Sequence, residues 1–286
     1  SILRILNQAG IETEERDFGR IFCKKSANEI VSYLYETSRN SGVHFFLNTS
    51  VSEVLYTTQF KVICKEGQFE SPNLLIATGG LAWPQIGATN LGYQIARQFG
   101  HKIMPLKPAL TGFILPLESP LLNLQGISLD VRLQIRGKDI RVEEPLLFTH
   151  KGISGPSVFQ TSCFWEKEDV IIINFLPSED IILQMHEPSN GKLLVKSLLA
   201  PFLPERLIKA LVPESLLARK VAELGKRDRK IIAECIHAFP VCPDTVEGFS
   251  KAEATLGGVS TDEINPQNME SLLLKGLFFS GEVMDI

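Results

Sequence analysis

The chain lacks a long hydrophobic run and the short motifs that identify several common catalytic sites. No apolar stretch in its 286 residues approaches the ~20 residues needed to span a bilayer, so we expect no membrane segment. It contains no Walker-type phosphate loop, no HExxH zinc motif and no GxSxG nucleophile motif. It also contains no GxGxxG, which a complete dinucleotide-binding chain carries near its first strand. The usual signatures of P-loop NTPases, zinc peptidases and serine hydrolases are therefore excluded.

Paired cysteines and an excess of basic charge are missing as well. The five cysteines are scattered, and no two of them form a CxxC pair. This spacing predicts free thiols in a reducing cytoplasm and argues against a structural zinc site. No signal peptide opens the chain, so we expect a cytoplasmic location. The formal net charge of −4 gives no electrostatic argument for nucleic acid as a partner.

The residues that are present predict a globular α/β protein. Hydrophobic residues make up 44% of the chain and charged residues 22%, which is ordinary for a packed core with a solvated surface. A capping box at Ser26 and Glu29 predicts a helix that ends at Gly42. Residues 43–47, 51–55, 60–64 and 74–77 read as strands, and residues 90–99 as a helix that stops at Gly100.

Composition changes near residue 106, where prolines become frequent. Residues 107–191 contain short alternating segments, of which residues 129–135 show the strict period of two that marks a half-buried strand. We predict a β-barrel-like module there. Residues 192–253 switch to helical spacing with prolines between the segments, which predicts a helical module. Residues 254–286 return to the first domain, whose earlier part is residues 1–106.

Three glycine-containing sites follow or interrupt predicted strands. The first is Ala77-Thr78-Gly79-Gly80, the second is Gly257-Gly258-Val259, and the third is Gly281-Glu282 after the apolar residues 277–280. Each alone is compatible with an ordinary turn. Ligands of doubly wound sheets lie beyond the carboxyl ends of the strands, where glycine lets the backbone approach them. Together the three sites predict a large, flat ligand held mainly through backbone.

Few other residues suggest chemistry. His150 can act as an acid or base near neutral pH, although a lone histidine in a turn is more often structural. The run Lys226-Arg227-Asp228-Arg229-Lys230 is typical of a solvated helix face.

A longer set of residues resembles one known family, the YhiN-like flavoproteins, which includes aminoacetone oxidase. The resemblance runs in order through nearly the whole chain. It is carried by Gly19-Arg20-Ile21-Phe22, residues 75–80, Trp83-Pro84, Gly87, Gly92-Tyr93, residues 106–110, residues 147–156 and residues 254–285.

The resemblance implies a Rossmann-like FAD-binding domain interrupted by a β-barrel-like and a helical module. It places Ala77, Thr78, Gly79 and Gly80 near the diphosphate and ribose of FAD, and Val51 near the adenine. It places Gly257, Gly258 and Val259 near the isoalloxazine ring. Gly281 and Glu282 would contact the ribityl and diphosphate portion.

The sequence also departs from this family. The family opens with a strand, GxGxxG and an acidic residue, and it continues past the Gly-Glu-Val-Met-Asp match into a segment that covers the flavin. The domain is therefore incomplete by comparison, and we expect the sequence to be a fragment of a longer protein. A fragment without the glycine-rich turn would hold FAD poorly.

The resemblance implies an FAD-dependent oxidoreductase that transfers a hydride between a small organic substrate and flavin. Reoxidation by oxygen or another acceptor, and reduction by NAD(P)H, are equally compatible with the sequence. The alternative is a non-catalytic binding or scaffold module that keeps the fold, because fold alone does not fix function. Substrate and oligomeric state stay open.

Overall fold

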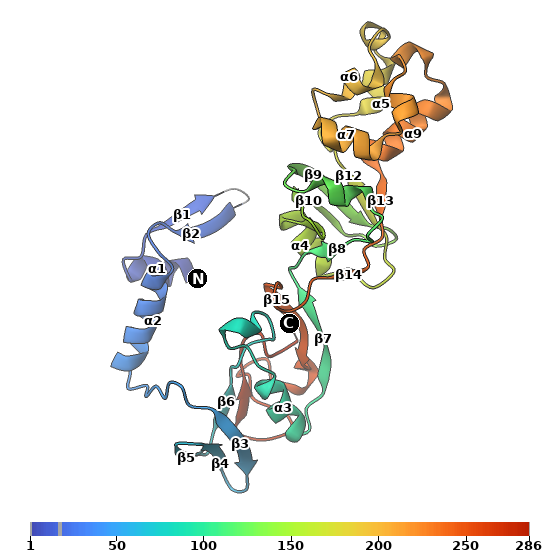
Figure 1. Ribbon diagram of the computed structural model, residues 1–286. Helices are drawn as coiled ribbons and strands as arrows, with labels where there is room; N and C mark the ends of the chain where they lie inside the picture. The colour runs from blue at the N-terminus through green and yellow to red at the C-terminus, as the bar shows by residue number, and fades with distance from the viewer. Residues whose placement is uncertain (1, 17–18, 286) are drawn as a thin grey trace. The chain divides into compact units, whose positions relative to one another are not determined.

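The computed structural model describes residues 2–16 and 19–285. The chain divides into two compact units, Ser1–Glu70 and Ser71–Ile286, which are described separately below. Figure 1 shows the order of the elements along the chain.

The first unit combines two helices, a hairpin and a small sheet. Helix α1 (Ile2–Gln8) precedes an antiparallel hairpin of β1 (Thr13–Arg16) and β2 (Arg20–Cys23), and α2 (Asn28–Asn40) follows. The sheet has the order β3-β4-β5 and is built from β3 (Val51–Tyr56), β4 (Phe60–Cys64) and β5 (Gly67–Ser71). The antiparallel pairing of β3 with β4 confirms the strand pair predicted there.

Helix α2 begins differently from the prediction. Its N-cap is Ala27, and the Ser26 hydroxyl accepts a hydrogen bond from the Asn28 N–H at 3.2 Å. Ser26 therefore closes a local turn one step before the helix, because a serine oxygen readily binds an N–H two residues on. Gly42, with φ of 86°, follows the helix as predicted.

The predicted strand at residues 43–47 is wrong. These residues form no strand in the described chain, and their aromatic rings pack on neighbours instead. Phe45 contacts Tyr35 of α2 with ring centroids 4.9 Å apart, and Phe46 contacts Phe69 of β5 at 4.5 Å. The apolar run thus reflects ring packing and not a backbone ladder.

The second unit begins and ends on a parallel strand pair. Strand β6 (Leu74–Ile76) pairs with β16 (Leu277–Phe279), so the two ends of this unit share one layer. Helix α3 (Leu91–Gln98) lies next along the chain, with Asn90 as its N-cap and Gly100 at φ of 88° just after it. Strands β7 (Ile103–Ala109) and β15 (Ala254–Val259) then form an antiparallel ribbon that leads into and out of the middle of the chain.

The middle of the chain forms a seven-stranded antiparallel sheet in the order β13-β12-β9-β10-β11-β8-β14. Its strands are β8 (Phe113–Ile114), β9 (Ser128–Ile135), β10 (Arg141–Phe148), β11 (Gly152–Ser154), β12 (Ile171–Asn174), β13 (Phe239–Val241) and β14 (Thr245–Val246). The alternation predicted for residues 129–135 is confirmed, since Val131, Leu133 and Ile135 are fully buried. The sheet is not a closed barrel among the described residues, because β13 and β14 are both edges.

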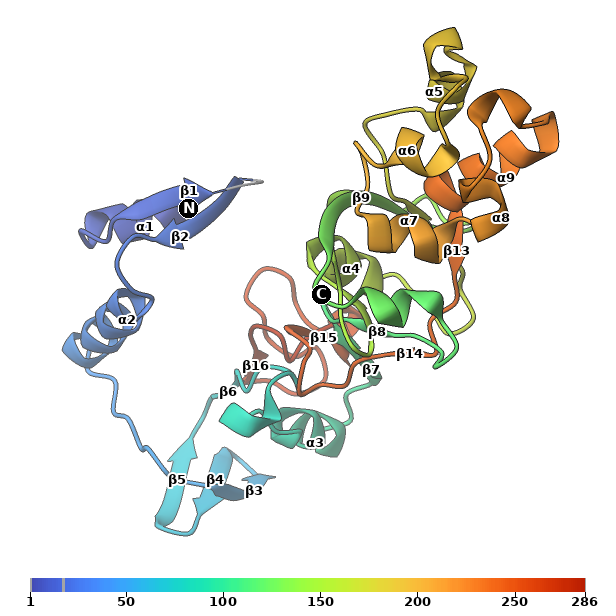
Figure 2. The same cartoon turned by 45° about the horizontal axis from the view of Figure 1, so that its top comes forward.

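Short helices fill the connection between β12 and β13, and Figure 2 shows them grouped beside the sheet. They are α5 (Ile181–His186), α6 (Val195–Leu199), α7 (Glu205–Leu211), α8 (Glu214–Leu217) and α9 (Lys226–His237), while α4 (Pro156–Ser162) packs on β10. The helices and the sheet share one hydrophobic core, which includes Leu133, Phe175, Leu207 and Ile236. The predicted helical and β-rich modules are therefore packed as one body.

Candidate functional site

The candidate site is the edge where β6 and β16 both end. Leu74 pairs with Leu277 and Ile76 pairs with Phe279 in parallel register, so the turns that follow the two strands lie at the same edge. The Ser280 N–H donates to the Ile76 carbonyl at 3.0 Å and extends this pairing by one step. Two of the three predicted glycine sites are thus brought together where ligands of parallel sheets bind.

Thr255 of β15 links both turns. Its N–H donates to the Glu282 carboxylate Oε1 at 2.6 Å. Its hydroxyl Oγ1 accepts hydrogen bonds from the N–H groups of Leu81 at 2.8 Å and Ala82 at 3.2 Å. One side chain and one backbone group therefore hold the loop after β6, the start of β15 and the turn after β16 in one fixed arrangement.

Gly80 is required by this arrangement. A Cβ at residue 80 would lie 2.4 Å from Thr255 Oγ1 and 2.5 Å from Glu282 Oε1, both far below contact distance. Gly80 is buried, and its missing side chain lets the loop approach the two polar groups.

The outer side of the edge is open. Gly79 and Gly281 have left-handed φ angles of 72° and 77°, and a Cβ at either residue would meet nothing within 4 Å. Ala77 and Thr78 are exposed beside them. The backbone of both turns is therefore accessible, with no side chain at the two glycines to obstruct a ligand.

Two residues of α3 support the edge, and they were named in the sequence only as part of the family resemblance. A Cβ on Gly92 would lie 2.1 Å from Thr78 Oγ1 and 3.0 Å from a methyl of Val283, so the first turn of α3 sits directly against both turns. Tyr93 is fully buried, and its hydroxyl lies 3.5 Å from the Glu282 carbonyl. Burial, and then the negative charge of Glu282, raise the pKa of Tyr93, so the phenol stays protonated.

The second glycine pair packs against backbone. A Cβ on Gly257 would lie 2.2 Å from the Pro105 carbonyl oxygen of β7, and one on Gly258 would lie 2.7 Å from the Val283 carbonyl oxygen. The ladder of β15 with β7 shifts register between Leu256 and Gly258. Val259 N–H donates to the Val283 carbonyl at 2.9 Å. These glycines thus have a packing reason, and their predicted approach to a flavin ring stays a prediction.

Two predicted residues belong to other elements of the chain. His150 is exposed in the turn between β10 and β11, and no contact in the described chain joins it to Thr255 or Glu282. Val51 begins β3 in the first unit. Their predicted roles stay predictions.

The described residues contain no group of three or more His, Cys, Asp or Glu side chains placed to hold a metal ion. Among the described helices, none has the length and apolar character needed to cross a bilayer.

FAD was the cofactor predicted from the sequence, and the edge fits one side of such a group. An extended dinucleotide needs accessible backbone at strand ends, which Ala77, Thr78, Gly79 and Gly281 provide. Glu282 presents the carboxylate oxygen Oε1 to Thr255, and the second oxygen of a carboxylate can accept a hydrogen bond from a hydroxyl group.

Comparison with known proteins gives one family. The family model described as the HI0933-like protein Rossmann domain matches residues 1–286. The chain is 34% identical to a protein of Haemophilus influenzae named ribosomal RNA dihydrouridine synthase, over 99% of this chain and 73% of that protein. It is 35% identical to the Escherichia coli protein of the same name, over 99% of this chain and 72% of that protein.

A third relative carries a different name. The chain is 27% identical to the 3-dehydro-bile acid delta(4,6)-reductase of Clostridium scindens, over 99% of this chain and 73% of that protein. The match to the family model and this reductase support an oxidoreductase in general, in agreement with the resemblance found in the sequence. With its full length matched, its Rossmann-type strand pair and its two relatives above 30% identity, the chain belongs to the HI0933-like Rossmann-domain family of YhiN-like proteins.

Proposed function

We propose that the protein is an FAD-dependent reductase that adds two hydrogens across the carbon–carbon double bond of a uridine in ribosomal RNA. The observation that carries the proposal is the match of 99% of the chain to two proteins named ribosomal RNA dihydrouridine synthase, at 34% and 35% identity. The name of the third relative also describes reduction of double bonds. Saturation of a double bond is therefore the chemistry that all three names share.

Within this proposal, bound FAD would supply the hydride-transfer chemistry, with a nicotinamide cofactor or a similar donor as the source of electrons. The protein's part is binding and orientation. The backbone at Thr78, Gly79 and Gly281 would hold the dinucleotide at the open edge, since Thr78 and Gly281 are exposed and no side chain obstructs the two glycines. Thr255 and Glu282 position both turns through the bonds at 2.6 and 2.8 Å. His150 stays a candidate acid or base by sequence alone.

The proposal departs from the sequence-based expectation of a small-molecule substrate and no nucleic acid. The exclusion of nucleic acid rested on the whole-chain charge of −4, and the small-molecule substrate came from the family resemblance. Net charge describes the average surface, whereas nucleic acid binding depends on where cations gather.

Two measurements test the proposal. The absorbance spectrum of the purified full-length protein should show flavin bands near ~450 nm, and their absence even after FAD is added would refute the cofactor. Ribosomal RNA from a strain in which the gene is deleted should lack dihydrouridine. The modified nucleoside should return when the gene is restored. An unchanged dihydrouridine content in the deletion strain would refute ribosomal RNA as the substrate. A spectrum without flavin would favour the non-catalytic alternative.

A further inference from the structure

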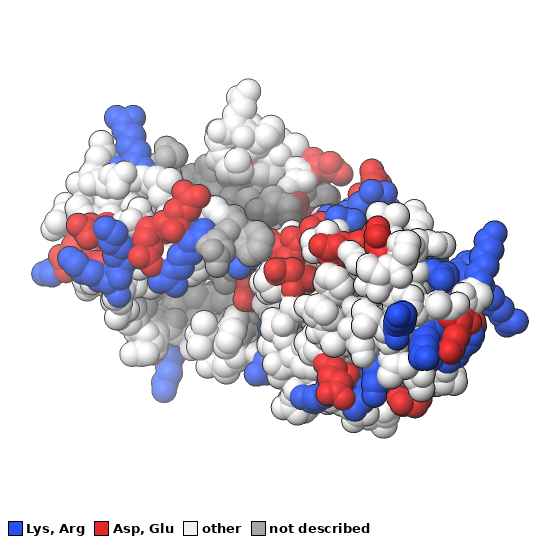
Figure 3. All heavy atoms as spheres, turned by 90° about the horizontal axis from the view of Figure 1, so that it is seen from above, with Lys and Arg blue, Asp and Glu red and all other residues white. Residues whose placement is uncertain are grey.

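Positive charge is concentrated on the helical part of the chain. Residues 181–238 contain ten Lys and Arg against six Asp and Glu, a formal net of +4, while the whole chain is −4. The rest of the chain therefore carries −8. In Figure 3, Lys and Arg side chains project from the outer edge of this helical part, seen at the right of the view.

Two adjoining hollows bring cations together on this part. One, of about 790 Å³, lies between α5 and α9, and the other, of about 210 Å³, lies over β9, β10 and β12. His237 lines both, so the two hollows adjoin at this residue. Five Lys and Arg line the two hollows against one acidic lining residue, Glu234. One of the five, Arg132, is paired with Glu143 outside the lining at 2.8 Å, so the excess of positive charge lies mainly in the larger hollow. The five are Arg132, Arg141, Lys226, Arg229 and Lys230, and we call them the α9 cationic surface.

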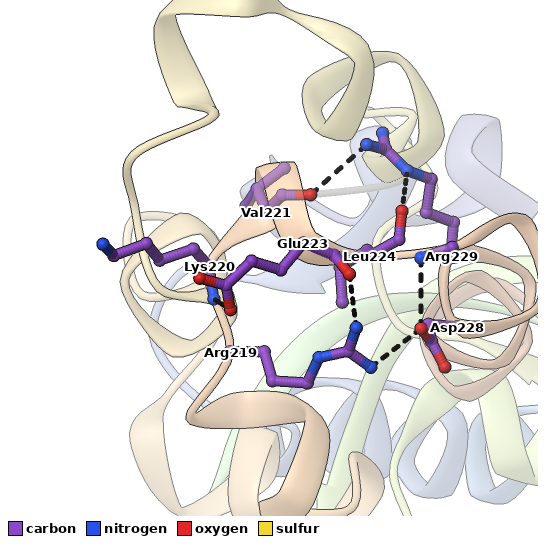
Figure 4. Close-up of polar contacts among 8 residues, drawn as sticks. Arg219, Lys220, Val221, Glu223, Leu224, Asp228 and Arg229 are labelled. Atoms are coloured by element: carbon purple, nitrogen blue, oxygen red, sulfur yellow. Dashed lines mark hydrogen bonds and ion pairs between the residues drawn. The ribbon is translucent and has the colours of Figure 1, made fainter.

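The hydrogen-bond partners of Arg229 leave its charge uncompensated, and Figure 4 shows two of them, Val221 and Leu224. Its guanidinium donates to the carbonyls of Val221 and Leu224, both at 3.3 Å, and to that of Met185. None of these acceptors is a carboxylate. Arg219 next to it differs, because it pairs with Asp228 at 2.8 Å. Arg229 thus anchors the start of α9 and leaves positive charge in the larger hollow.

The two lysines of this surface are poorly explained by helix stability. Lys226 and Lys230 stand four residues apart on α9, where like charges face each other and destabilise a helix. Lys226 also occupies the first turn of α9, where the helix dipole favours anions. Lys230 has only an exposed pair with Glu234 at 3.6 Å, which contributes little. Helix stability therefore does not account for the positions of these two lysines.

A third hollow of the helical part shows the contrast. It measures about 370 Å³ and is lined by Lys196, Lys209, Glu205 and Glu214, so its charges balance. Lys209 is moreover paired with Glu205 at 2.6 Å. An excess of positive charge is therefore specific to the α9 cationic surface among these three hollows.

We propose that the α9 cationic surface binds the phosphate backbone of single-stranded RNA and docks the RNA substrate. This rests on the proposed function, which supplies RNA as the partner. The row of cations matches the repeated negative charge of phosphates, and aliphatic side chains such as Ile182 and Ala233 line the larger hollow, where riboses and bases can rest.

The test measures binding directly. A fluorescein-labelled oligouridylate is titrated with the full-length protein, and its anisotropy is followed at several salt concentrations. The variant Lys226→Gln/Lys230→Gln should bind about tenfold more weakly at low salt. Its plot of log affinity against log salt should be shallower by about 1.4, since each phosphate contact on a single strand contributes about 0.7 to the slope. Arg229 stays unchanged because it holds α9.

The matched control is Lys196→Gln/Lys209→Gln, which removes the same charge from the balanced hollow and should bind as the unmodified protein does. If RNA binding were weakened equally in both variants, or if the unmodified protein did not bind, the proposal that the α9 cationic surface binds RNA would be overturned. Dihydrouridine in ribosomal RNA is measured separately. If the dihydrouridine content did not depend on the gene, the proposed function would be refuted. The anisotropy of the two variants would still decide whether this surface binds RNA.

Discussion

The Glu282 carboxylate accepts a hydrogen bond from the backbone N–H of Thr255 across 2.6 Å. This bond ties β15 to the turn after β16, and no other side chain in the described chain accepts the Thr255 N–H. Replacement Glu282→Ala leaves that N–H without its acceptor, and bonds to charged groups contribute about 1.5–3 kcal/mol. We expect the free energy of unfolding to fall by about 2 kcal/mol in urea titrations.

Two further variants distinguish the lost Thr255 hydrogen bond from the lost negative charge as the cause of the destabilisation. Glu282→Gln keeps an acceptor oxygen without the charge, so its loss should be smaller than that of Glu282→Ala. Glu253→Ala removes an exposed carboxylate next to β15 and should leave stability unchanged. Equal losses in Glu282→Ala and Glu253→Ala would contradict the role given to the Thr255 contact.

Gly80→Ala should damage both stability and cofactor retention. The new methyl would lie within 2.5 Å of Thr255 Oγ1 and Glu282 Oε1, so the loop after β6 must move away from both. Overpacking of this kind costs about 1–3 kcal/mol. Gly248→Ala is the matched control, since a Cβ at residue 248 meets nothing within 4 Å and no positive φ is involved. Flavin released per protein on gel filtration should rise for Gly80→Ala and not for Gly248→Ala.

Gly92→Ala should destabilise the protein although alanine favours helices. In an unconstrained helix interior this replacement gains about 0.5–1 kcal/mol. Here the methyl would meet Thr78 Oγ1 at 2.1 Å and push α3 away from the strand ends. Thermal unfolding checks the sign. A melting temperature above that of the unmodified protein would show that Thr78 simply rotates aside.

The double variant Gly92→Ala/Thr78→Ala tells the two explanations apart. Removing the Thr78 hydroxyl takes away the nearest clash, so it should recover part of the lost stability. The Val283 methyl, at 3.0 Å from the added Cβ, should prevent full recovery.

The strand-end glycines could be read from the sequence because their signal is local. An apolar run followed by Thr78-Gly79-Gly80 or by Gly281-Glu282 marks a buried strand and its turn within a few residues. The parallel pairing of β6 with β16 joins segments about two hundred residues apart, and it was not predicted. The family resemblance implied only that residues 254–286 return to the first domain. Strands β13 and β14 were missed because two or three residues carry no visible period.

The role of Thr255 could not be predicted in the same way. Its hydroxyl binds the Leu81 N–H, 174 residues away along the chain, and nothing in the local pattern distinguishes that threonine from any other. The strand predicted at residues 43–47 was wrong for the opposite reason. Its pattern suits a strand, but the contacts of Phe45 and Phe46 with other rings decide its conformation.

A buried histidine, His101, and a half-buried one, His237, should make stability fall in mild acid. Both ring nitrogens of His101 have a hydrogen-bond partner. Nδ1 lies 3.1 Å from Glu263 Oε2, and Nε2 lies 2.8 Å from Ser271 Oγ. His237 Nε2 accepts the Ile181 N–H at 3.1 Å, so this nitrogen has no room for a proton. Burial lowers the pKa of both imidazoles below 6.5, despite the opposing effects of Glu263 and Asp180.

The sign follows from proton binding in the two states. Above about pH 6.5 both histidines are neutral whether the chain is folded or unfolded, so they contribute no pH dependence. Below that pH the unfolded chain binds protons first, and the free energy of unfolding falls by up to about 1.4 kcal/mol per pH unit for each histidine. The loss is complete once the pH has passed below the folded pKa.

Urea unfolding between about pH 5 and about pH 8 measures this slope. His237→Gln keeps an amide that can accept from Ile181 and donate to Asn174 but cannot be protonated, so it should remove about half of the slope in mild acid. His101→Gln should remove the other part in the same way. A slope unchanged in both variants would place the acid sensitivity on other groups and contradict the neutral state assigned to these two rings.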